Sequence, residues 1–235
     1  MIRICIVEKE PEKVNELKSK LEKFGFVYDE ENPEVVLAFG GDGILLIAER
    51  IYPGIPKILI KKSEICKKGV DLDIEEILRK YANKEFSIEK IPKLKASLKS
   101  KFGGAELIAV NDVVIRNTLP TEAIRFKLKI NNELLKSGGN FIGDGLVIAT
   151  PYGSGAYFHS ITKQNFKEGI GIAFSNLTEH HDFVLLNSGD KIEVEITRGP
   201  AVLVADNNRN FINLEAGDIV KVEETREFAS RILLR

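Results

Sequence analysis

The spacing of apolar residues changes near residue 93, and this change limits the folds that the chain can adopt. Before it, apolar runs such as "EVVLAF" (34–39) and "PKILIKK" (56–62) are separated by segments with apolar residues at helical spacing. After it, apolar and charged residues alternate one by one, as in "RFKLKI" (125–130) and "IEVEIT" (192–197). The sequence therefore predicts an α/β part followed by a β-rich part.

The first part is predicted to be a Rossmann-like α/β domain. A β-branched run at 3–9 is followed by a helix that Pro11 opens and Gly25 ends. The apolar residues of this helix recur three or four positions apart: Val14, Leu17, Leu21 and Phe24. A second helix is predicted over 72–84. Strands that alternate with helices predict a parallel sheet, and ligands of such sheets bind at the carboxyl ends of the strands.

The chain is expected to form two domains, an α/β domain over 1–92 and a mostly antiparallel all-β domain over 93–235. Turn clusters such as "INNE" (130–133) and "RGP" (198–200) separate the strands of the second domain. The last ~12 residues are expected to pack back on the first domain, since chain ends often lie close together. The cleft between two domains is the default place for a ligand.

Composition excludes several classes of partner. The chain has 235 residues, 34 Lys plus Arg and 35 Asp plus Glu, so its formal charge of -1 attracts neither nucleic acid nor an anionic membrane. Cys5 and Cys66 form no C-x-x-C pair, and the three histidines include no metal-ligand spacing, so no metal site is predicted. No apolar run of 18 residues is present, and we expect a cytoplasmic protein.

A Gly-Gly-Asp-Gly turn connects the run at 34–39 with a predicted helix. Glycines ahead of a helix let backbone N–H groups approach a phosphate, and Gly40, Gly41 and Gly43 offer such a surface. A carboxylate beside bound phosphate is repelled unless a metal or a hydroxyl lies between them, so Asp42 suits phosphoryl transfer better than anion binding. The alternative interpretation is that Asp42 is a helix N-cap.

Two further segments place polar residues in apolar surroundings. Asn111 and Asp112 interrupt the strand "AVNDVVIRN", where each unpartnered polar side chain would cost roughly 1–3 kcal/mol. The segment 143–160, "GDGLVIATPYGSGAYFHS", joins a strand to a dense turn. There Tyr157 could stack on a base, and hydroxyl groups could bind a ligand from Thr150, Ser154 and Ser160. We expect Tyr157 and Asn111 to share one cleft; the alternative is that Tyr157 fills the core.

Taken in order, these motifs make the chain resemble the NAD kinases, which transfer phosphate from ATP or polyphosphate to the adenosine-ribose 2′-hydroxyl of NAD. The resemblance rests on Gly-Gly-Asp-Gly at 40–43, Asn-Asp at 111–112, Gly-Asp-Gly at 143–145 and the turn that ends at Tyr157. It implies a two-domain architecture like that of the NAD kinases. It also implies ATP or polyphosphate as donor, Mg²⁺ or another divalent cation, and a homo-oligomer, either a dimer or a tetramer.

The resemblance also implies roles for individual residues. Asp42 would be the general base that accepts the ribose 2′-hydroxyl proton, and it would contact NAD together with Gly43. The phosphates would be lined by Gly40, Gly41 and Gly43, with Arg50 as a further phosphate contact. The residues that would bind the dinucleotide in the second domain are Asn111, Asp112, Asp144, Thr150, Ser154, Gly155, Ala156, Tyr157, Ser160 and Asn208. Asp206 aligns with an Asp-Gly element of the family that reads "DNN" here.

The chain departs from the family after its second predicted strand–helix–strand unit. Family members usually carry a stretch Asn-x-Gly-x-x-Gly-Phe-Leu, where this chain has "KKSEICKKG" (61–69). The lysines of this stretch are more typical of a solvated basic loop, and the alternative hypothesis is that they contact a phosphate donor. These lysines are Lys61, Lys62, Lys67 and Lys68. The family's Pro-His segment lies near His180 and His181, a pair more typical of a solvated loop than of a site.

Two other functions stay open at this point. One is a kinase for another hydroxyl, because the glycine turn also resembles diacylglycerol kinases, sphingosine kinases and phosphofructokinases. The other is a nucleotide-binding sensor without turnover. The Asn-Asp pair and the Tyr157 turn favour a dinucleotide substrate over a lipid or sugar. Asp42 favours an enzyme over a sensor, since a binding protein gains little from a carboxylate that faces a polyphosphate.

Overall fold

The computed structural model describes residues 1–8, 12–62, 66, 68–136 and 139–235. The chain divides into two compact units. Unit 1 comprises Met1–Ile91 together with Phe228–Arg235, and unit 2 comprises Pro92–Glu227. Two long strands, β5 (Phe86–Ser100) and β17 (Ile219–Leu234), contribute residues to both units.

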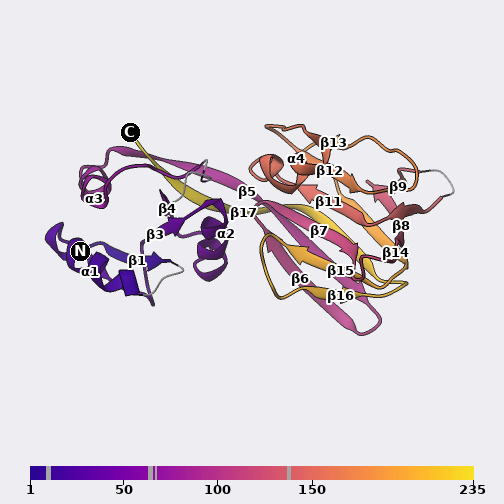
Figure 1. The fold of residues 1–235 in the computed structure, drawn as a ribbon, viewed down its shortest axis with the longest axis horizontal. Helices are drawn as coiled ribbons and strands as arrows, with labels where there is room; N and C mark the ends of the chain where they lie inside the picture. Colours follow the sequence, from indigo (N-terminus) through magenta and orange to yellow (C-terminus); the bar gives the residue numbers. More distant parts are fainter. Residues whose placement is uncertain (9–11, 63–65, 67, 137–138) are drawn as a thin grey trace. The chain divides into compact units, whose positions relative to one another are not determined.

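Unit 1 is the predicted α/β part (Figure 1). Its parallel strands follow the order β4-β3-β1-β2, and the end of β17 pairs with β4. The strands are β1 (Arg3–Val7), β2 (Val27–Tyr28), β3 (Val35–Gly40) and β4 (Lys57–Lys61). The helices are α1 (Glu12–Lys23), α2 (Asp42–Ile51) and α3 (Ile74–Ala82). The helix predicted between Pro11 and Gly25 is thus confirmed as α1, and Gly25 follows it with φ +75°.

The strands of unit 1 are apolar on both faces because both are covered. Ile4, Leu37 and Ile58 are fully buried, as are Ile77 and Leu78 of α3. Helix α2 is fixed to the sheet at its far end by a buried ion pair. The Lys57 ammonium donates to the Glu49 carboxylate and, at 2.6 Å, to the Tyr52 carbonyl. A buried pair of this kind fixes the position of the helix that begins at Asp42.

Unit 2 is built from antiparallel strands, as the one-by-one alternation predicted. One sheet has the order β13-β12-β11-β7-β15-β16. Its strands are β7 (Asp112–Asn117), β11 (Gly145–Ala149), β12 (Ile170–Ser175), β13 (Val184–Leu186), β15 (Ala201–Ala205) and β16 (Ile212–Leu214). The other pairings join β6 (Gly103–Ala109), β8 (Ile124–Ile130), β9 (Glu133–Leu134), β10 (Phe141–Gly143) and β14 (Ile192–Arg198) with β5 and β17.

The core of unit 2 unites both sets of strands. Phe126 and Val194 from β8 and β14 lie in one buried cluster with Ile115, Ile148 and Leu203 from the central sheet. The other face of the central sheet is covered by a short helical stretch, η1 (Ser154–Phe158) and α4 (His159–Thr162). Phe158 is fully buried against β7 and β11 in this second layer. The predicted polar turn at 150–160 therefore leads into a helix that packs on the sheet (Figure 1).

Candidate functional site

The glycine turn of unit 1 lies at the carboxyl end of β3, where the sequence places a ligand site. Gly40 has φ +154°, a conformation that favours glycine. The N-cap of α2 is Gly41, which makes no side-chain capping bond, and Asp42 is the first helical residue. The interpretation of Asp42 as an N-cap is therefore wrong.

The Asp42 side chain contacts the segment that departs from the family pattern. Its Oδ1 accepts a hydrogen bond from the Lys68 backbone N–H at 3.2 Å and lies 3.5 Å from the Cys66 Sγ. Asp42 is half-buried and Gly43 is exposed. Arg50 is eight residues further along α2, about 12 Å along the helix axis. The structure thus brings Asp42 to the glycine turn but leaves Arg50 at the opposite end of the helix.

The lysines of 61–69 do not act as one basic cluster. The Lys61 ammonium lies 3.1 Å from the Asp71 carboxylate, and Lys62 is paired with Glu8. Lys67 lies outside the described residues. Burial lowers the pKa of the Lys68 ammonium and nearby Arg231 lowers it further, against the opposing effect of Asp42. Among the described lysines of this segment, Lys68 therefore has an ammonium group that interacts electrostatically with the Asp42 carboxylate.

In unit 2, the Asn111–Asp112 pair lies at the start of strand β7 and is held by the carboxylate of Asp206, the residue that follows β15. The Asp206 side chain accepts hydrogen bonds from the backbone N–H groups of Val110, Asn111 and Asp112, at 2.9, 2.7 and 3.2 Å. The Asp206 N–H returns a bond of 2.9 Å to the Asp112 carbonyl. Asp206 itself has φ +52°, a left-handed conformation that costs energy for a residue other than glycine. These contacts make Asp206 a clamp on the Asn-Asp segment.

The Asp112 carboxyl group is buried beside this clamp. Burial raises its pKa, and the charge of Asp206 raises it further, to about 7 from an ordinary value of 3.8. The Asn111 side chain is half-buried, and its Oδ1 is a buried oxygen without a hydrogen-bond partner among the described residues. Such an oxygen favours a site that a ligand donor would complete.

The raised pKa of Asp112 predicts an unusual pH dependence of stability. Between its unfolded and folded pKa values, about 4 to 7, the folded chain binds the proton more tightly, so stability falls as pH rises through this window. Carboxylates with lowered pKa values, such as Glu106 and Glu193, have the opposite effect at lower pH. The stability that they contribute is lost as pH falls below this window.

We therefore expect Asp112→Asn to be increasingly more stable than the unmodified chain from pH 5 to pH 8. Urea unfolding at each pH, with Asp71→Asn as an exposed control, measures this difference. A difference that is constant across this range would contradict the assignment of a raised pKa to Asp112.

The turn after β11 is folded against Asn111. The Thr150 N–H donates to the Asn111 carbonyl at 2.9 Å, and the Thr150 hydroxyl donates to the Val110 carbonyl at 2.6 Å. A Cβ added to Gly153 would come within 2.1 Å of the Asn111 carbonyl oxygen, so only glycine allows this approach. The Ser154 hydroxyl donates to the Pro151 and Phe166 carbonyls. Thr150 and Ser154 are buried, and their hydroxyl groups hold the turn together instead of facing outward as predicted.

The next residues of the turn are the accessible ones. Gly155, Ala156 and Ser160 are exposed. Tyr157 is half-buried and packs beside the buried cluster of Phe158, so it fills part of the second layer, as the alternative interpretation proposed. The Ser160 hydroxyl donates to the Tyr157 carbonyl at 2.7 Å.

Two further predicted dinucleotide contacts, Asp144 and Asn208, lie outside this turn. Asp144 precedes β11 while Thr150 follows it, so at ~3.3 Å per residue the two are about 20 Å apart along the strand. The Asp144 carboxylate accepts bonds from the Asn117 and Asn176 amides, at 3.4 and 3.3 Å. Asn208 follows β15 near the Asp206 clamp, and its Oδ1 accepts a bond from the Asn210 N–H. The structure therefore brings Asn208, but not Asp144, to the Asn111 end.

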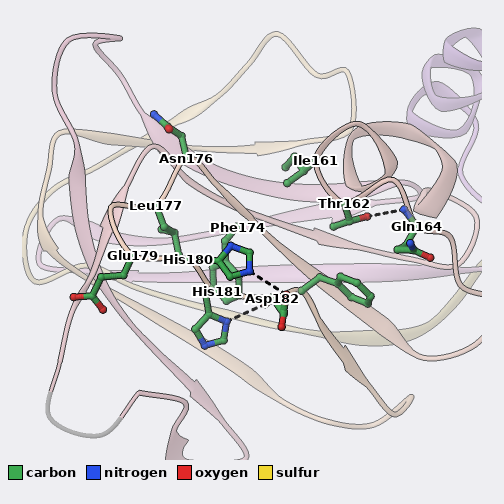
Figure 2. A pocket seen from close by; sticks show the side chains of 11 residues that line it. Ile161, Thr162, Gln164, Phe174, Asn176, Leu177, Glu179, His180, His181 and Asp182 are labelled. Atoms are coloured by element: carbon green, nitrogen blue, oxygen red, sulfur yellow. Dashed lines mark hydrogen bonds and ion pairs between the residues drawn. The ribbon is translucent and has the colours of Figure 1, made fainter.

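A cavity of about 430 Å³ opens beside α4, between residues 161–164 and 174–183 (Figure 2). Figure 2 shows His180 and His181 turned toward Asp182, with His180 Nε2 3.2 Å from the carboxylate. The His181 ring packs on Phe174, with ring centroids 4.8 Å apart. Sequence reasoning missed this cavity, since the only signal was the His-His pair. Among the described residues, no group of three His, Cys, Asp or Glu side chains is placed to hold a metal ion.

A comparison with known protein families matches the part of the chain that contains the Asn111 end of unit 2. The sequence profile described as the ATP-NAD kinase C-terminal domain matches residues 110–233, more than half of the chain. The chain belongs to the NAD kinase family. This family member is 33% identical over 168 residues to the NAD kinase of Sulfurisphaera tokodaii, an alignment that covers 68% of this chain and 62% of that protein. It is 30% identical over 149 residues to NAD kinase 1 of Oceanobacillus iheyensis, covering 60% of this chain and 54% of the relative.

The matched part is thus less than two thirds of the length of these curated NAD kinases. Solved structures extend the likeness to the whole chain. A structure of an NAD kinase from Archaeoglobus fulgidus in complex with ATP superposes with a TM-score of 0.81 at 19% identity, covering 100% of this chain and 94% of that one. Yeast NADH kinase complexed with NADH gives 0.86 at 15% identity, covering 100% and 84%. These likenesses show that this family member has the two-domain NAD kinase fold.

Proposed function

We propose that the chain is an NAD kinase that phosphorylates the adenosine-ribose 2′-hydroxyl of NAD to give NADP, with ATP or polyphosphate as donor. The observation that carries this proposal is the Asp42 carboxylate, which begins helix α2 next to three glycines without serving as the helix cap. The family membership supports the substrate. Relatives that bear the name NAD kinase and the neighbours solved with ATP and with NADH support the donor and the acceptor.

In the proposed reaction Asp42 accepts the proton of the ribose 2′-hydroxyl while the hydroxyl oxygen attacks the terminal phosphorus of the donor. The bond from this phosphorus to the leaving phosphate oxygen breaks, so ADP or a shortened polyphosphate leaves. We infer that the backbone of Gly40, Gly41 and Gly43 lies along the phosphates and that Lys68 supplies the nearby positive charge.

We infer that the dinucleotide is bound in unit 2 by groups around the Asn111 end of the central sheet. Asn111 offers an unpartnered side-chain oxygen, and Asp112 offers a carboxyl group that is partly protonated near neutral pH. Gly155, Ala156, Tyr157 and Ser160 form the accessible part of the adjoining turn. We also propose Asp144 and Arg50 as contacts outside these groups. Asp144 lies beyond the other end of β11, and Arg50 lies in the last turn of α2.

Mg²⁺ or another divalent cation would neutralise the donor phosphates. Magnesium needs only one or two protein carboxylates when nucleotide phosphates supply the other ligands. We further infer a cytoplasmic homo-oligomer, a dimer or a tetramer, with no nucleic acid or membrane as partner. No helix in the described part of the chain has the length and apolarity needed to cross a membrane. Light scattering on the purified protein measures the oligomeric state.

A panel of acceptors tests the substrate. Purified protein is incubated with Mg²⁺ and either ATP or polyphosphate, and with NAD, NADH, a diacylglycerol or a hexose phosphate. We expect phosphate transfer to NAD or NADH to exceed transfer to the other hydroxyls by at least about 100-fold, because the site would bind a dinucleotide. Faster transfer to the lipid or sugar would replace the proposal, and tight NAD binding without any transfer would indicate a sensor.

A further inference from the structure

We propose that Cys66, Lys68 and Arg231 form a network that positions the Asp42 carboxylate for proton transfer. Cys66 and Lys68 would then hold the catalytic base in place. The proposal rests on the proposed function, since it concerns the base of that reaction. All four residues belong to unit 1.

Two donors converge on one oxygen of Asp42. The Cys66 thiol lies 3.5 Å from Oδ1, and the Lys68 backbone N–H donates to the same Oδ1 at 3.2 Å. A carboxylate held at one oxygen cannot rotate freely about its Cβ–Cγ bond. We therefore assign the other oxygen, Oδ2, to the proton of the substrate hydroxyl.

The Cys66 side chain is closely packed against Gly69. It is buried, and a Cβ added to Gly69 would come within 2.8 Å of its sulfur, so the segment folds tightly around the thiol. Burial raises the pKa of the Cys66 thiol, and the charge of Asp42 raises it further. The thiol therefore stays protonated at neutral pH and acts as a hydrogen-bond donor to the carboxylate.

Arg231 holds the same segment from its other side. Its Nη1 donates to the Lys68 carbonyl at 3.1 Å, while Nε and Nη2 both lie 2.8 Å from the Glu89 Oε2. The planar guanidinium can make these contacts at once, whereas a lysine ammonium offers no such fork. The backbone of Lys68 is thus held at its carbonyl by Arg231 and presents its N–H to Asp42. Strands β5 and β17 carry Glu89 and Arg231, so regular structure anchors the network.

Cysteine variants test the first contact. Cys66→Ala removes the donor, and we expect kcat to fall about 3- to 10-fold while KM for NAD and for ATP changes less than about 2-fold. Cys66→Ser restores a donor and is expected to recover kcat to within about 2-fold of the unmodified enzyme. The matched control is Cys5→Ala, because Cys5 is the other buried cysteine of unit 1 and its thiol contacts Tyr52 and the Ile6 carbonyl. This control should keep kcat even if its thermal midpoint falls.

Arginine variants test the second contact. Arg231→Met and Arg231→Lys are both expected to lower kcat about 10-fold or more, since a misplaced catalytic group loses rate steeply. Arg79→Met serves as the control, because Arg79 forms an exposed ion pair with Glu76 in α3. Thermal midpoints measured on every variant separate lost positioning from lost fold. A kcat that is unchanged in both Cys66→Ala and Arg231→Met would overturn the network.

A crystal structure separates failure of the network from failure of the proposed function. In Arg231→Met we expect the Lys68 N–H to leave Asp42 Oδ1 and the carboxylate to take another rotamer; an unmoved Asp42 would overturn the network whatever the activity. If the unmodified enzyme transfers no phosphate to NAD but Asp42 moves as expected, the network stands and the proposed reaction fails.

Discussion

Asp42→Asn is expected to lower kcat by roughly 10²–10⁴-fold while the protein stays folded. Asparagine keeps the size of the side chain, and its carbonyl oxygen can still accept the bonds from Lys68 and Cys66. It cannot accept the hydroxyl proton, so the loss falls on the chemical step. Because Gly41 is the helix cap, the stability cost is limited to the lost charge at the helix N-terminus, about 0.3–1 kcal/mol.

Kinetics and thermal midpoints of Asp42→Asn and Asp42→Ala measure both effects. Asp71→Asn is the matched control, since Asp71 is an exposed carboxylate of the same unit that pairs with Lys61. The control should retain its turnover. Near-normal turnover in Asp42→Asn would show that Asp42 only shapes the turn, and activity losses that follow the thermal midpoint would lead to the same conclusion.

Gly153→Ala is expected to disrupt the dinucleotide site. The added Cβ would lie 2.1 Å from the Asn111 carbonyl oxygen and 2.5 Å from the Asn111 Cα, and both are backbone atoms that cannot swing away. Either the turn or the start of β7 has to move, at a cost of about 1–3 kcal/mol or more in the free energy of unfolding. We expect the affinity for NAD to fall by about 100-fold, because Asn111 and Asp112 shift relative to the turn that carries Tyr157.

Isothermal titration with NAD and urea unfolding measure the two effects. Gly155→Ala is the control for stability, because its Cβ would meet only the Asn165 side chain at 3.8 Å, an ordinary contact. The close approach of the turn to Asn111 would be contradicted if Gly153→Ala had the same unfolding free energy as Gly155→Ala and bound NAD with normal affinity.

Local patterns predicted most of the fold. The helix that begins after Pro11 and ends at Gly25 is present, because apolar spacing and a left-handed glycine act over a few residues. The strands containing Phe126 and Val194 are present for the same reason, since their alternation already encodes one buried face. The NAD kinase fold was inferred from four motifs in order and agrees with the solved neighbours.

The site was harder to predict because its contacts join distant residues. Asp206 lies 94 residues from Asp112, and nothing in "DNN" reveals that one carboxylate accepts three backbone N–H groups. Thr150 and Ser154 were predicted to offer hydroxyl groups to a ligand, but these hydroxyls donate to the backbone carbonyls of Val110 and Pro151. Asp144 is close to Thr150 in sequence, yet an extended strand separates them. The contacts of Asp42 with Cys66 and Lys68 adjoin Arg231, which lies at the far end of the chain.

One measurement tests the proposed enzyme most directly. Purified protein and its Asp42→Asn variant are incubated side by side with NAD, Mg²⁺ and ATP or polyphosphate, and the product is detected with a dehydrogenase that accepts only NADP. We expect NADP to form with the unmodified protein and to form at least about 100-fold more slowly with the variant. No NADP from the unmodified protein with either donor, or equal rates from the two proteins, would contradict an NAD kinase with Asp42 as its base.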